Sequence, residues 1–235
     1  LSSFPFPSLP NKQDNVLFHS IIFPGTQIGT KGTWTKVNHL SATEYLNYED
    51  RQFSKSRGVG VFGNNAQESG IPADVYRFYL LYIRPETADT HFDWADLIAK
   101  HNNELLNNLG NFVHRALTFA NKYFGGKTAP ITLTAEDQAA VDDINKELAA
   151  YVDTLETQVK LRDGLKHMLA ISRLGNQLMQ TNKPWALVKE GNMARAGSVI
   201  SLCCNIVALL SALIKPFMPA VADALCAQLK FTPTS

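Results

Sequence analysis

The stretch DWADLIAKHNNELLNNLGNFVHRALTFANKYF, residues 93–124, decides the fold of most of this 235-residue chain. Its apolar residues recur at intervals of three and four, which predicts one long amphipathic helix. The apolar stripe consists of Trp94, Leu97, Ile98, Leu105, Leu109, Phe112, Val113 and Ala116. Asp93 and Asp96 have the spacing of a capping box at the start of this helix, and Gly125 and Gly126 end it.

The chain on both sides of this helix is also predicted to be helical. Pro72 suits the first turn of a helix through DVYRFYLLYI, which stops before Pro85. Further helices are predicted over residues 134–155, 161–180 and 194–214, and after Pro219. Long helices joined by short linkers predict an antiparallel bundle.

Residues 1–70 have a different pattern, typical of α/β or β structure. Val16 to Phe23 is a short apolar run of the kind found in a buried strand or a short helix. Glu44 to Tyr48 predicts a strand that leads into a glycine-rich loop. Turns are expected at Gly25, Gly29, Thr30, Gly32 and Thr33. The expected fold class is therefore mainly α, with an α/β segment before the bundle.

The composition is that of an ordinary globular protein. Hydrophobic residues make up 45% of the chain, charged residues 18%, and the net charge is +1. Such a charge neither indicates nor excludes a nucleic-acid partner. The apolar run from Ser198 to Ile214 contains polar side chains, which favours a core helix over a membrane span.

The three cysteines, Cys203, Cys204 and Cys226, form no Cys-x-x-Cys pair and lie in apolar helical sequence. We interpret them as buried thiols in a reducing compartment, with neither a zinc site nor a disulfide framework. The opening LSSFPFPSLPNK is a poor signal peptide, and we expect the chain to be a fragment of something longer.

The stretch FSKSRGVGVFG, residues 53–63, contains the spacing Gly58-x-Gly60-x-x-Gly63. A dinucleotide-binding loop needs a strand directly before this pattern and a helix directly after it. Here the predicted strand ends about eight residues too early for that motif, and residues 64–67 do not look like an apolar helix start. The kinase motifs His-Arg-Asp and Asp-Phe-Gly are absent as well. The glycines then indicate either a mobile surface loop or another way of holding phosphate.

The other half of this stretch favours phosphate binding. Ser54, Lys55 and Ser56 place one ammonium group and two hydroxyls on a glycine-bearing loop, with Arg51 and Arg57 beside them. A loop of this kind can close over a triphosphate and stabilise charge that develops during nucleotidyl transfer.

Several stretches together resemble the class I aminoacyl-tRNA synthetases, and most closely the cytosolic eukaryotic methionyl-tRNA synthetases. They are residues 46–60, residues 71–85, residues 105–112, Asn182-Lys-Pro-Trp185 and Pro216-Phe-Met-Pro219. The resemblance covers about residues 13–230 and keeps the motifs in order. It implies a Rossmann-type nucleotide-binding segment in residues 1–80, the C-terminal part of a catalytic domain, and an anticodon-binding bundle in residues 81–235.

The resemblance also implies a reaction: methionine and ATP, bound with Mg, form methionyl-adenylate, and methionine then passes to its tRNA. Lys55 aligns with the second lysine of the family's Lys-Met-Ser-Lys-Ser signature, so it is the expected catalytic residue, with Ser54 and Ser56 beside it at the ATP phosphates. A solvated loop lysine is the alternative. The first lysine of the signature is replaced by Gln52, next to Arg51, which weakens the expected handling of ATP.

Methionine-binding residues are implied near the start of the chain. Asp14-Asn-Val-Leu-Phe-His19 resembles the family's pocket segment, which places Asn15 at the pocket wall and His19 near the substrate side chain. The alternative is that His19 is a core residue with a hydrogen-bond partner.

Three residues of the bundle are implied in reading the anticodon. Asn111 and Arg115 are four residues apart and share a helical face, and Trp185 follows Pro184. Asn can bind a base edge, and Arg and Trp can stack on unpaired bases. A solvated Asn–Arg face and a core Trp are the alternatives.

The chain also departs from the family. No His-x-Gly-His motif and no zinc-bearing insertion occur, so no metal site is expected, and either a truncation or an imperfect gene model is indicated. We expect a cytoplasmic protein, inactive alone, whose partners are methionine tRNA, ATP, methionine and a multi-synthetase complex, but no membrane. The alternatives are a free-standing tRNA-binding module or another class I synthetase.

Overall fold

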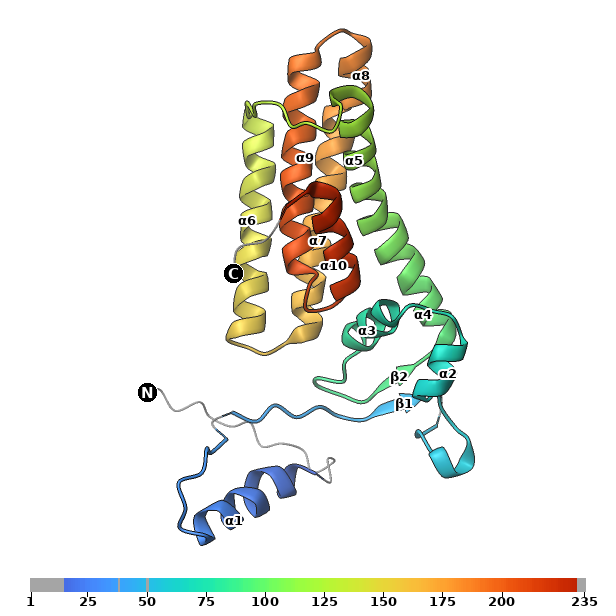
Figure 1. The fold of residues 1–235 in the computed structure, drawn as a ribbon, viewed down its shortest axis with the longest axis vertical. Coiled ribbons are helices and arrows are strands. Elements are labelled where there is room, and N and C mark those ends of the chain that lie inside the picture. The colour runs from blue at the N-terminus through green and yellow to red at the C-terminus, as the bar shows by residue number, and fades with distance from the viewer. Residues whose placement is uncertain (1–14, 38, 50, 232–235) are drawn as a thin grey trace. The chain divides into compact units, whose positions relative to one another are not determined.

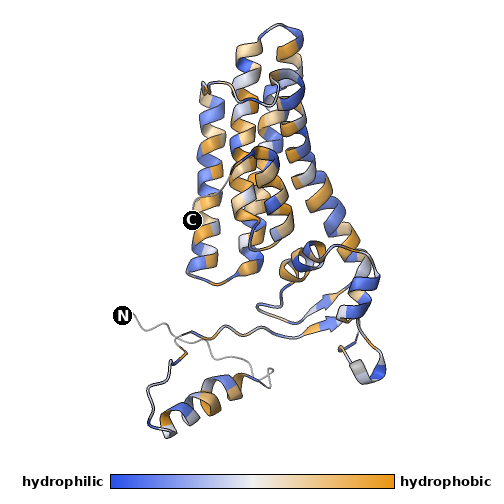
Figure 2. Cartoon of the chain, in the orientation of Figure 1, coloured by the Kyte–Doolittle hydropathy of each residue, from blue (hydrophilic) through white to orange (hydrophobic). Residues whose placement is uncertain are grey.

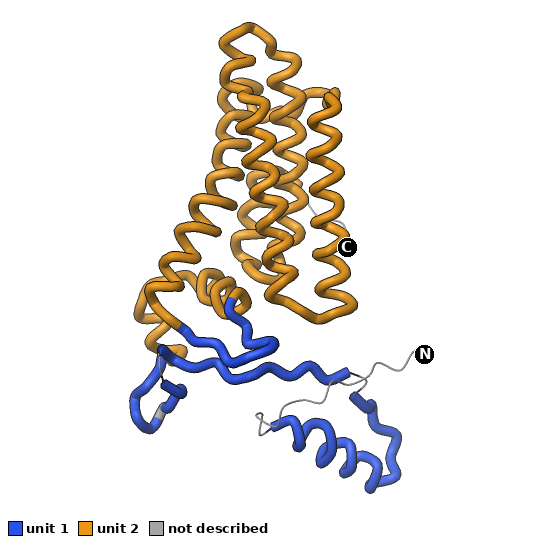
Figure 3. The backbone as a smooth tube through the Cα atoms, turned by 180° about the vertical axis from the view of Figure 1, so that it is seen from behind, with its two compact units in different colours: residues 1–60, 83–92 blue, residues 61–82, 93–235 orange. Residues whose placement is uncertain are grey.

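A computed structural model describes residues 15–37, 39–49 and 51–231, with only the backbone of Lys55. The chain forms two compact units (Figure 3). Unit 1 comprises Leu1–Gly60 and Ile83–Phe92, and unit 2 comprises Val61–Tyr82 and Asp93–Ser235. The predicted boundary between residues 80 and 81 concerns domains of a larger enzyme, so it stays a prediction.

Unit 1 contains a small parallel sheet and a short helical segment. Its elements are a π-helical turn η1 (Phe18–Ile22), α1 (Phe23–Gly29), β1 (Leu46–Tyr48), a 3-10 turn η2 (Lys55–Arg57) and β2 (Thr90–Phe92). Strands β1 and β2 pair in parallel, with Leu46 opposite Thr90 and Tyr48 opposite Phe92. The predicted strand and the α/β class are confirmed. Strand β2 was missed because three residues are too few for a recognisable alternation.

Aromatic contacts hold the end of this sheet together. The ring of Tyr48 stacks on that of Phe92 with 6.0 Å between centroids, and lies 5.5 Å from that of Phe53. The backbone N–H of Glu49 donates to the carbonyl of Phe92 at 2.8 Å. These contacts fix the point at which the glycine-bearing loop leaves β1.

The apolar run Val16–Phe23 is helical, so the helix alternative is confirmed and the strand alternative is wrong. Its predicted burial is also wrong in unit 1, where Phe18 and Ile21 are 53% and 62% exposed. A hydrophobic run is buried only if another surface covers it, and the described residues of unit 1 do not cover this one. Gly25 lies inside α1 and makes no turn there.

Unit 2 is the helical bundle. Its elements are α2 (Gly63–Glu68), α3 (Ala73–Tyr82), α4 (Trp94–Lys100), the π-helix η3 (His101–Gly110), α5 (Asn111–Phe124), α6 (Ala135–Glu156), α7 (Leu161–Asn182), α8 (Pro184–Lys189), α9 (Met193–Leu213) and α10 (Pro219–Leu229). Figure 1 shows α5, α6, α7 and α9 as its long helices. Figure 2 shows apolar and polar residues alternating along these helices, and the apolar residues that pack together form the core of the bundle. The predicted bundle is confirmed, and only the short α2 and α8 were missed.

The stretch 93–124 folds as one continuous helical rod. The carboxylate of Asp93 accepts a hydrogen bond from the backbone N–H of Asp96 at 2.6 Å, which is one half of the predicted capping box. The N–H of Asp93 donates to the Tyr79 hydroxyl at 3.3 Å and not to the side chain of Asp96. Gly125, with φ of 59°, ends the rod in the left-handed conformation. Its middle, η3, is π-helical, which the sequence did not indicate.

Helix α9 forms the centre of the bundle. It is long and apolar enough to cross a membrane, but 72% of its most apolar window is buried inside the structure. Cys203 and Cys204 are buried on this helix, and Cys226 is half-buried on α10. Burial raises the pKa of the Cys203 thiol to about 12. The thiols are therefore packing residues, as the sequence indicated.

Helices α5 and α7 approach closely at one glycine. Phe112 is fully buried, and a Cβ atom built on Gly175 would lie 2.5 Å from the Cζ atom of its ring. Only glycine therefore leaves room for this ring on α7. The contact places the residues next to Phe112 and Gly175 beside each other on the two helices.

Candidate functional site

The loop after β1 is closed by a two-way backbone pair. The N–H of Ser54 donates to the carbonyl of Val59 at 2.8 Å, and the N–H of Val59 donates to the carbonyl of Ser54 at 2.9 Å. Gly60 has φ of 132°, and a Cβ there would lie 2.4 Å from the Phe53 ring. This glycine is thus required by the backbone conformation and by packing.

The structure corrects one argument against a dinucleotide loop. A short helix, α2, does begin at Gly63, where the side chain of Asn65 accepts from the N–H of Phe62 at 3.2 Å. The other argument holds, because β1 ends at Tyr48, a bridge between Tyr48 and Arg51 follows it, and Gly58 lies inside the later turn that Ser54 and Val59 close. The short strand-to-helix turn of a dinucleotide site is therefore not present at this loop.

The polar side chains of the closed turn gather around Ser54. The Arg57 Nε–H donates to the Ser54 hydroxyl at 3.1 Å, and the hydroxyls of Ser54 and Ser56 lie 3.4 Å apart. Lys55 begins the same 3-10 turn, but its side chain lies outside what the structure describes. The turn combines a cation with two hydroxyl groups, a donor set suited to phosphate oxygens.

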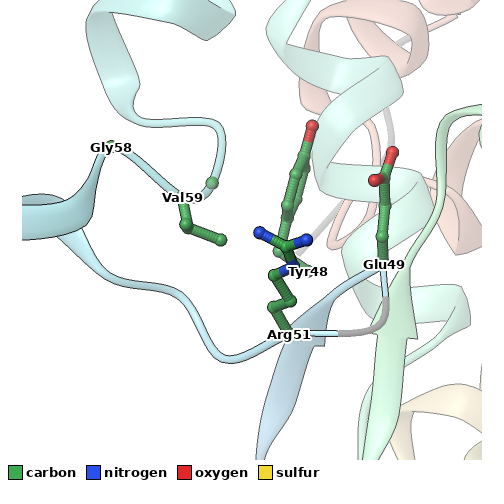
Figure 4. Close-up of a pocket in the computed structure, with 6 residues that line it drawn as sticks. Tyr48, Glu49, Arg51, Gly58 and Val59 are labelled. Atoms are coloured by element: carbon green, nitrogen blue, oxygen red, sulfur yellow. The ribbon is translucent and has the colours of Figure 1, made fainter.

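A pocket of about 340 Å³ opens beside this turn, between the end of β1 and the glycines. Its lining residues are Tyr48, Glu49, Arg51, Gly58, Val59 and Gly60. In Figure 4, Val59 points across the pocket toward Tyr48 and Arg51. Arg51 is the cation of this lining and Glu49 is its carboxylate, so the pocket carries one charge of each sign next to Gln52.

The two residues predicted to bind methionine lie on one exposed helical turn. The backbone N–H of His19 donates to the carbonyl of Asn15 at 3.2 Å, and both side chains are exposed in unit 1. The alternative, in which His19 is a core residue with a hydrogen-bond partner, is wrong in unit 1, because the side chain is exposed there. The predicted role of both residues stays a prediction.

The three residues predicted to read an anticodon come together in unit 2. The guanidinium carbon of Arg115 lies 5.3 Å from the centroid of the Trp185 ring, in a cation–π contact. Trp185, at the start of α8, is half-buried and packs against the core. Asn111 lies one turn before Arg115 on α5 and is exposed. The alternative of a solvated Asn–Arg face is wrong for Arg115, because its side chain is half-buried against the Trp185 ring.

Two supporting residues near this cluster were missed. The Nδ2 group of Asn111 donates to the Oδ1 atom of Asn176 on α7 at 3.2 Å. Asn182, three residues before Trp185, accepts from Arg195 Nη2 at 2.5 Å. Asn176 carries no sequence signal, because its partner is distant in the chain and polar helix positions are usually solvated.

A buried carboxylate organises the corner that precedes Trp185. Asp137 is fully buried and accepts hydrogen bonds from Arg195, Asn182 and the backbone N–H of Thr134. Burial alone would raise the pKa of Asp137, but these hydrogen bonds and the charge of Arg195 lower it overall. The pattern at residues 134–137 predicted a helix start, and that prediction is confirmed, but it did not predict the ion pair.

Comparison with known proteins decides the family. A family model described as tRNA synthetases class I (M) matches residues 12–117. A second, described as the anticodon binding domain of methionyl tRNA ligase, matches residues 129–235. The chain belongs to the methionyl-tRNA synthetase family. Its segments correspond to part of the class I catalytic domain and to the anticodon-binding domain.

Similar proteins include cytoplasmic methionine–tRNA ligases. The human cytoplasmic methionine–tRNA ligase is 53% identical over 223 residues, which are 94% of this chain and 25% of that protein. The Saccharomyces cerevisiae enzyme is 44% identical, over 90% of this chain and 28% of that protein. The chain thus spans about a quarter of the length of these relatives.

A solved structure confirms the fold. The Mycobacterium tuberculosis methionyl-tRNA synthetase in complex with methionyl-adenylate superposes with a TM-score of 0.82 at 22% identity. The match covers 94% of this chain and 43% of that one. The fold expected for a methionyl-tRNA synthetase segment is therefore confirmed. Within the described ranges, no group of three or more His, Cys, Asp or Glu side chains could hold a metal ion.

Proposed function

We propose that this chain serves in ATP-dependent attachment of methionine to its tRNA, and that its bundle binds the anticodon loop of that tRNA. The observation that carries this proposal is the stacking of Arg115 on Trp185, one turn from Asn111. Trp185 and Arg115 are only partly buried, so each keeps part of its planar surface accessible to a ligand. The same pair can stack on unpaired RNA bases, and Asn111 can bind a base edge.

The signature loop contributes to the ATP side of the reaction. Lys55, between Ser54 and Ser56, contacts the phosphates of ATP and stabilises the negative charge that develops as pyrophosphate leaves. Arg51 in the adjoining pocket supplies a second positive charge in place of the lysine that Gln52 replaces. Mg enters with ATP as part of the substrate. Asn15 and His19 contribute to the methionine pocket.

The chain as given does not activate methionine by itself. It contains no His-x-Gly-His motif, the second half of the ATP site in class I synthetases. We expect no ATP–pyrophosphate exchange by this polypeptide, and robust exchange would contradict this part of the proposal. We further propose that it acts in the cytoplasm, where its relatives are named, in association with other synthetases.

Anticodon binding is tested with fluorescently labelled RNA stem-loops. The chain is expected to bind a loop with the methionine anticodon, CAU, more tightly than a loop with an unrelated anticodon. Trp185→Ala should weaken binding by roughly tenfold or more, because base–aromatic stacking stabilises such complexes by about 1–3 kcal/mol. Trp34→Ala is the matched control, since Trp34 is an exposed tryptophan of unit 1.

The alternatives predict different results. Preference for another anticodon would identify a different class I synthetase. Tight CAU binding by a chain whose full natural polypeptide lacks ligase activity would favour a free-standing tRNA-binding module. Equal, weak binding of all loops by a protein with normal circular dichroism would overturn the proposal.

A further inference from the structure

A row of polar side chains crosses between α5 and α7 beside the Phe112–Gly175 contact. The Nδ2 group of Asn176 donates to the backbone carbonyl of Asn108 at 3.0 Å and to that of Ser172 at 3.3 Å. Its Oδ1 atom accepts from the Nδ2 group of Asn111 at 3.2 Å. Asn176 is half-buried and Asn111 is exposed. One amide thus connects two backbone carbonyls to a side chain predicted to contact RNA.

The chemistry of these partners determines which way each amide faces. A backbone carbonyl can only accept, so the donor side of Asn176 must face Asn108 and Ser172. The Oδ1 atom of Asn176 then faces Asn111, so Asn111 must donate to it through its Nδ2 group. The hydrogen-bond partners therefore assign which atom of each amide is the oxygen and which is the nitrogen.

We infer that Asn176 is a positioning residue that fixes the amide of Asn111 with its oxygen free for a ligand. This inference rests on the proposed function and names the base edge that the site prefers. An amide oxygen accepts a hydrogen bond, so the fixed Asn111 selects a base with an exocyclic amino group. Cytosine and adenine, both present in CAU, have such a group.

Fixing the amide matters because a free asparagine would not discriminate. Cytosine and uracil share a ring, but uracil has a carbonyl oxygen where cytosine has its amino group. A freely rotating amide can turn its nitrogen toward that oxygen and bind both bases. When Asn176 holds Asn111, one N–H of its Nδ2 group is engaged and the amide cannot flip, so a base on its Oδ1 side meets an acceptor. The amino group of cytosine can donate to that oxygen, whereas the carbonyl oxygen of uracil faces it oxygen to oxygen, which is unfavourable. The same argument applies to adenine, which has an amino group where hypoxanthine has a carbonyl oxygen.

The packing next to these residues supports a fixed geometry. Phe112 and Gly175 lie next to Asn111 and Asn176 in the chain, and their close contact keeps α5 against α7. The ion pair Glu104–Arg173, 2.9 Å apart, joins η3, which continues directly into α5, to α7. Asn176 is therefore attached to rigid helices on both sides, which a positioning role requires.

The test compares binding to stem-loops that differ in a single amino group. The RNA probes are CAU, the same loop with cytosine replaced by uracil, and the same loop with adenine replaced by hypoxanthine. For the unaltered chain we expect at least one amino-to-oxygen replacement to weaken binding by roughly tenfold. The quantity compared is the ratio of the affinity for the CAU loop to the affinity for the replaced loop. Asn176→Leu should reduce this ratio toward one. Gln177→Leu replaces the glutamine amide at the next, exposed position by leucine and should leave this ratio unchanged.

The outcome separates a positioning role from a structural one. If Asn176→Leu weakens binding to all three loops by the same factor, the ratio is preserved and the inference is overturned. Asn176→Ala provides a second, smaller variant if the leucine variant melts below the assay temperature. A loss of the ratio with a preserved melting temperature supports the inference.

A measurement without RNA distinguishes failure of this inference from failure of the proposed function. The side-chain NH₂ resonances of Asn111, assigned by their loss in Asn111→Ser, should show the two separate, slowly exchanging protons of a hydrogen-bonded amide. Asn176→Ala should make them exchange faster. If the unaltered chain binds no anticodon loop, the proposed function fails while this result still decides whether Asn176 holds Asn111. Unchanged resonances would overturn the positioning role.

Discussion

The guanidinium of Arg195 and the buried carboxylate of Asp137 are joined by two hydrogen bonds, from Nη1 to Oδ2 at 2.5 Å and from Nη2 to Oδ1 at 2.9 Å. Asp137 lies in the first turn of α6 and Arg195 in the first turn of α9. The same guanidinium also reaches Asn182 at the end of α7. Three helices therefore meet at one ion pair, and the residue that α7 contributes, Asn182, is three residues before Trp185 in the chain.

Asp137→Asn should lower the free energy of unfolding by about 3 kcal/mol, because it leaves the largely buried charge of Arg195 without its counter-ion. Urea denaturation followed by circular dichroism measures this change. Asp143→Asn is the matched control, because Asp143 pairs with Lys146 on the exposed face of the same helix. The control should show no measurable change. An equal, small effect in both variants would contradict a structural role for the buried pair.

The contribution of Asp137 to stability should depend on pH. Its pKa is lowered in the folded protein, although burial opposes this, because Arg195, Thr134 and Asn182 stabilise the ionised form. A lowered folded pKa means that the stabilisation is fully present above the unfolded pKa, about 3.9, and is lost as pH falls through the folded pKa. The difference in unfolding free energy between the unaltered chain and Asp137→Asn should therefore be constant near neutral pH and shrink in acid. Urea titrations at several pH values measure it, and a difference that grew in acid would contradict the assignment.

Gly175→Ala should destabilise the bundle by roughly 1–3 kcal/mol, since the new methyl group would overlap the buried Phe112 ring. The clash should also separate α5 from α7 and weaken the hydrogen bond from Asn111 to Asn176. Thermal unfolding measures the first effect. Gly63→Ala is the control within unit 2, because a Cβ at that position meets nothing within 4 Å. If the two variants melt alike, the close approach of the helices is not required for stability.

Arg115→Lys should weaken binding of the CAU stem-loop while keeping the positive charge. A lysine ammonium lacks the planar surface that stacks on a base and on the Trp185 ring. We expect a loss of roughly tenfold in affinity, consistent with the strength of such stacking contacts. Arg77→Lys is a suitable control, because Arg77 lies on α3, donates to the carbonyl of Pro216 and is not among the residues proposed to bind RNA. Equal affinity of Arg115→Lys and the unaltered chain would show that charge alone matters at this position.

The helices could be predicted because their determinants are local. The stripe from Trp94 to Ala116, the cap at Asp93 and the glycines after Phe124 all act within a few residues of each other. Asn111 and Arg115 share a face by their spacing alone. Elements without enough residues to show a period, such as β2 and α8, could not be recognised in this way.

The candidate site could be predicted only in part. The pairing of Asn111 with Arg115 follows from helical spacing, and Trp185 was added through the resemblance of Asn182-Lys-Pro-Trp185 to the family. Nothing in the sequence places Trp185 against Arg115, because seventy residues separate them in the chain (115 to 185). The glycine loop was interpreted through its residue types, whereas its closure by Ser54 and Val59 is a property of the folded backbone.

The sequence by itself determined the long helices, their caps, the buried character of α9 and the residue types that suit phosphate and RNA. Each of these depends on the period of apolar residues or on hydrogen bonds within one turn. The tertiary structure decided which distant residues meet: Arg115 with Trp185, Asn111 with Asn176, and Asp137 with Arg195. Such pairs depend on how the helices pack, and a single glycine at position 175 sets part of that packing. Helix periodicity specifies a face, but only the packed bundle specifies which side chain opposes it.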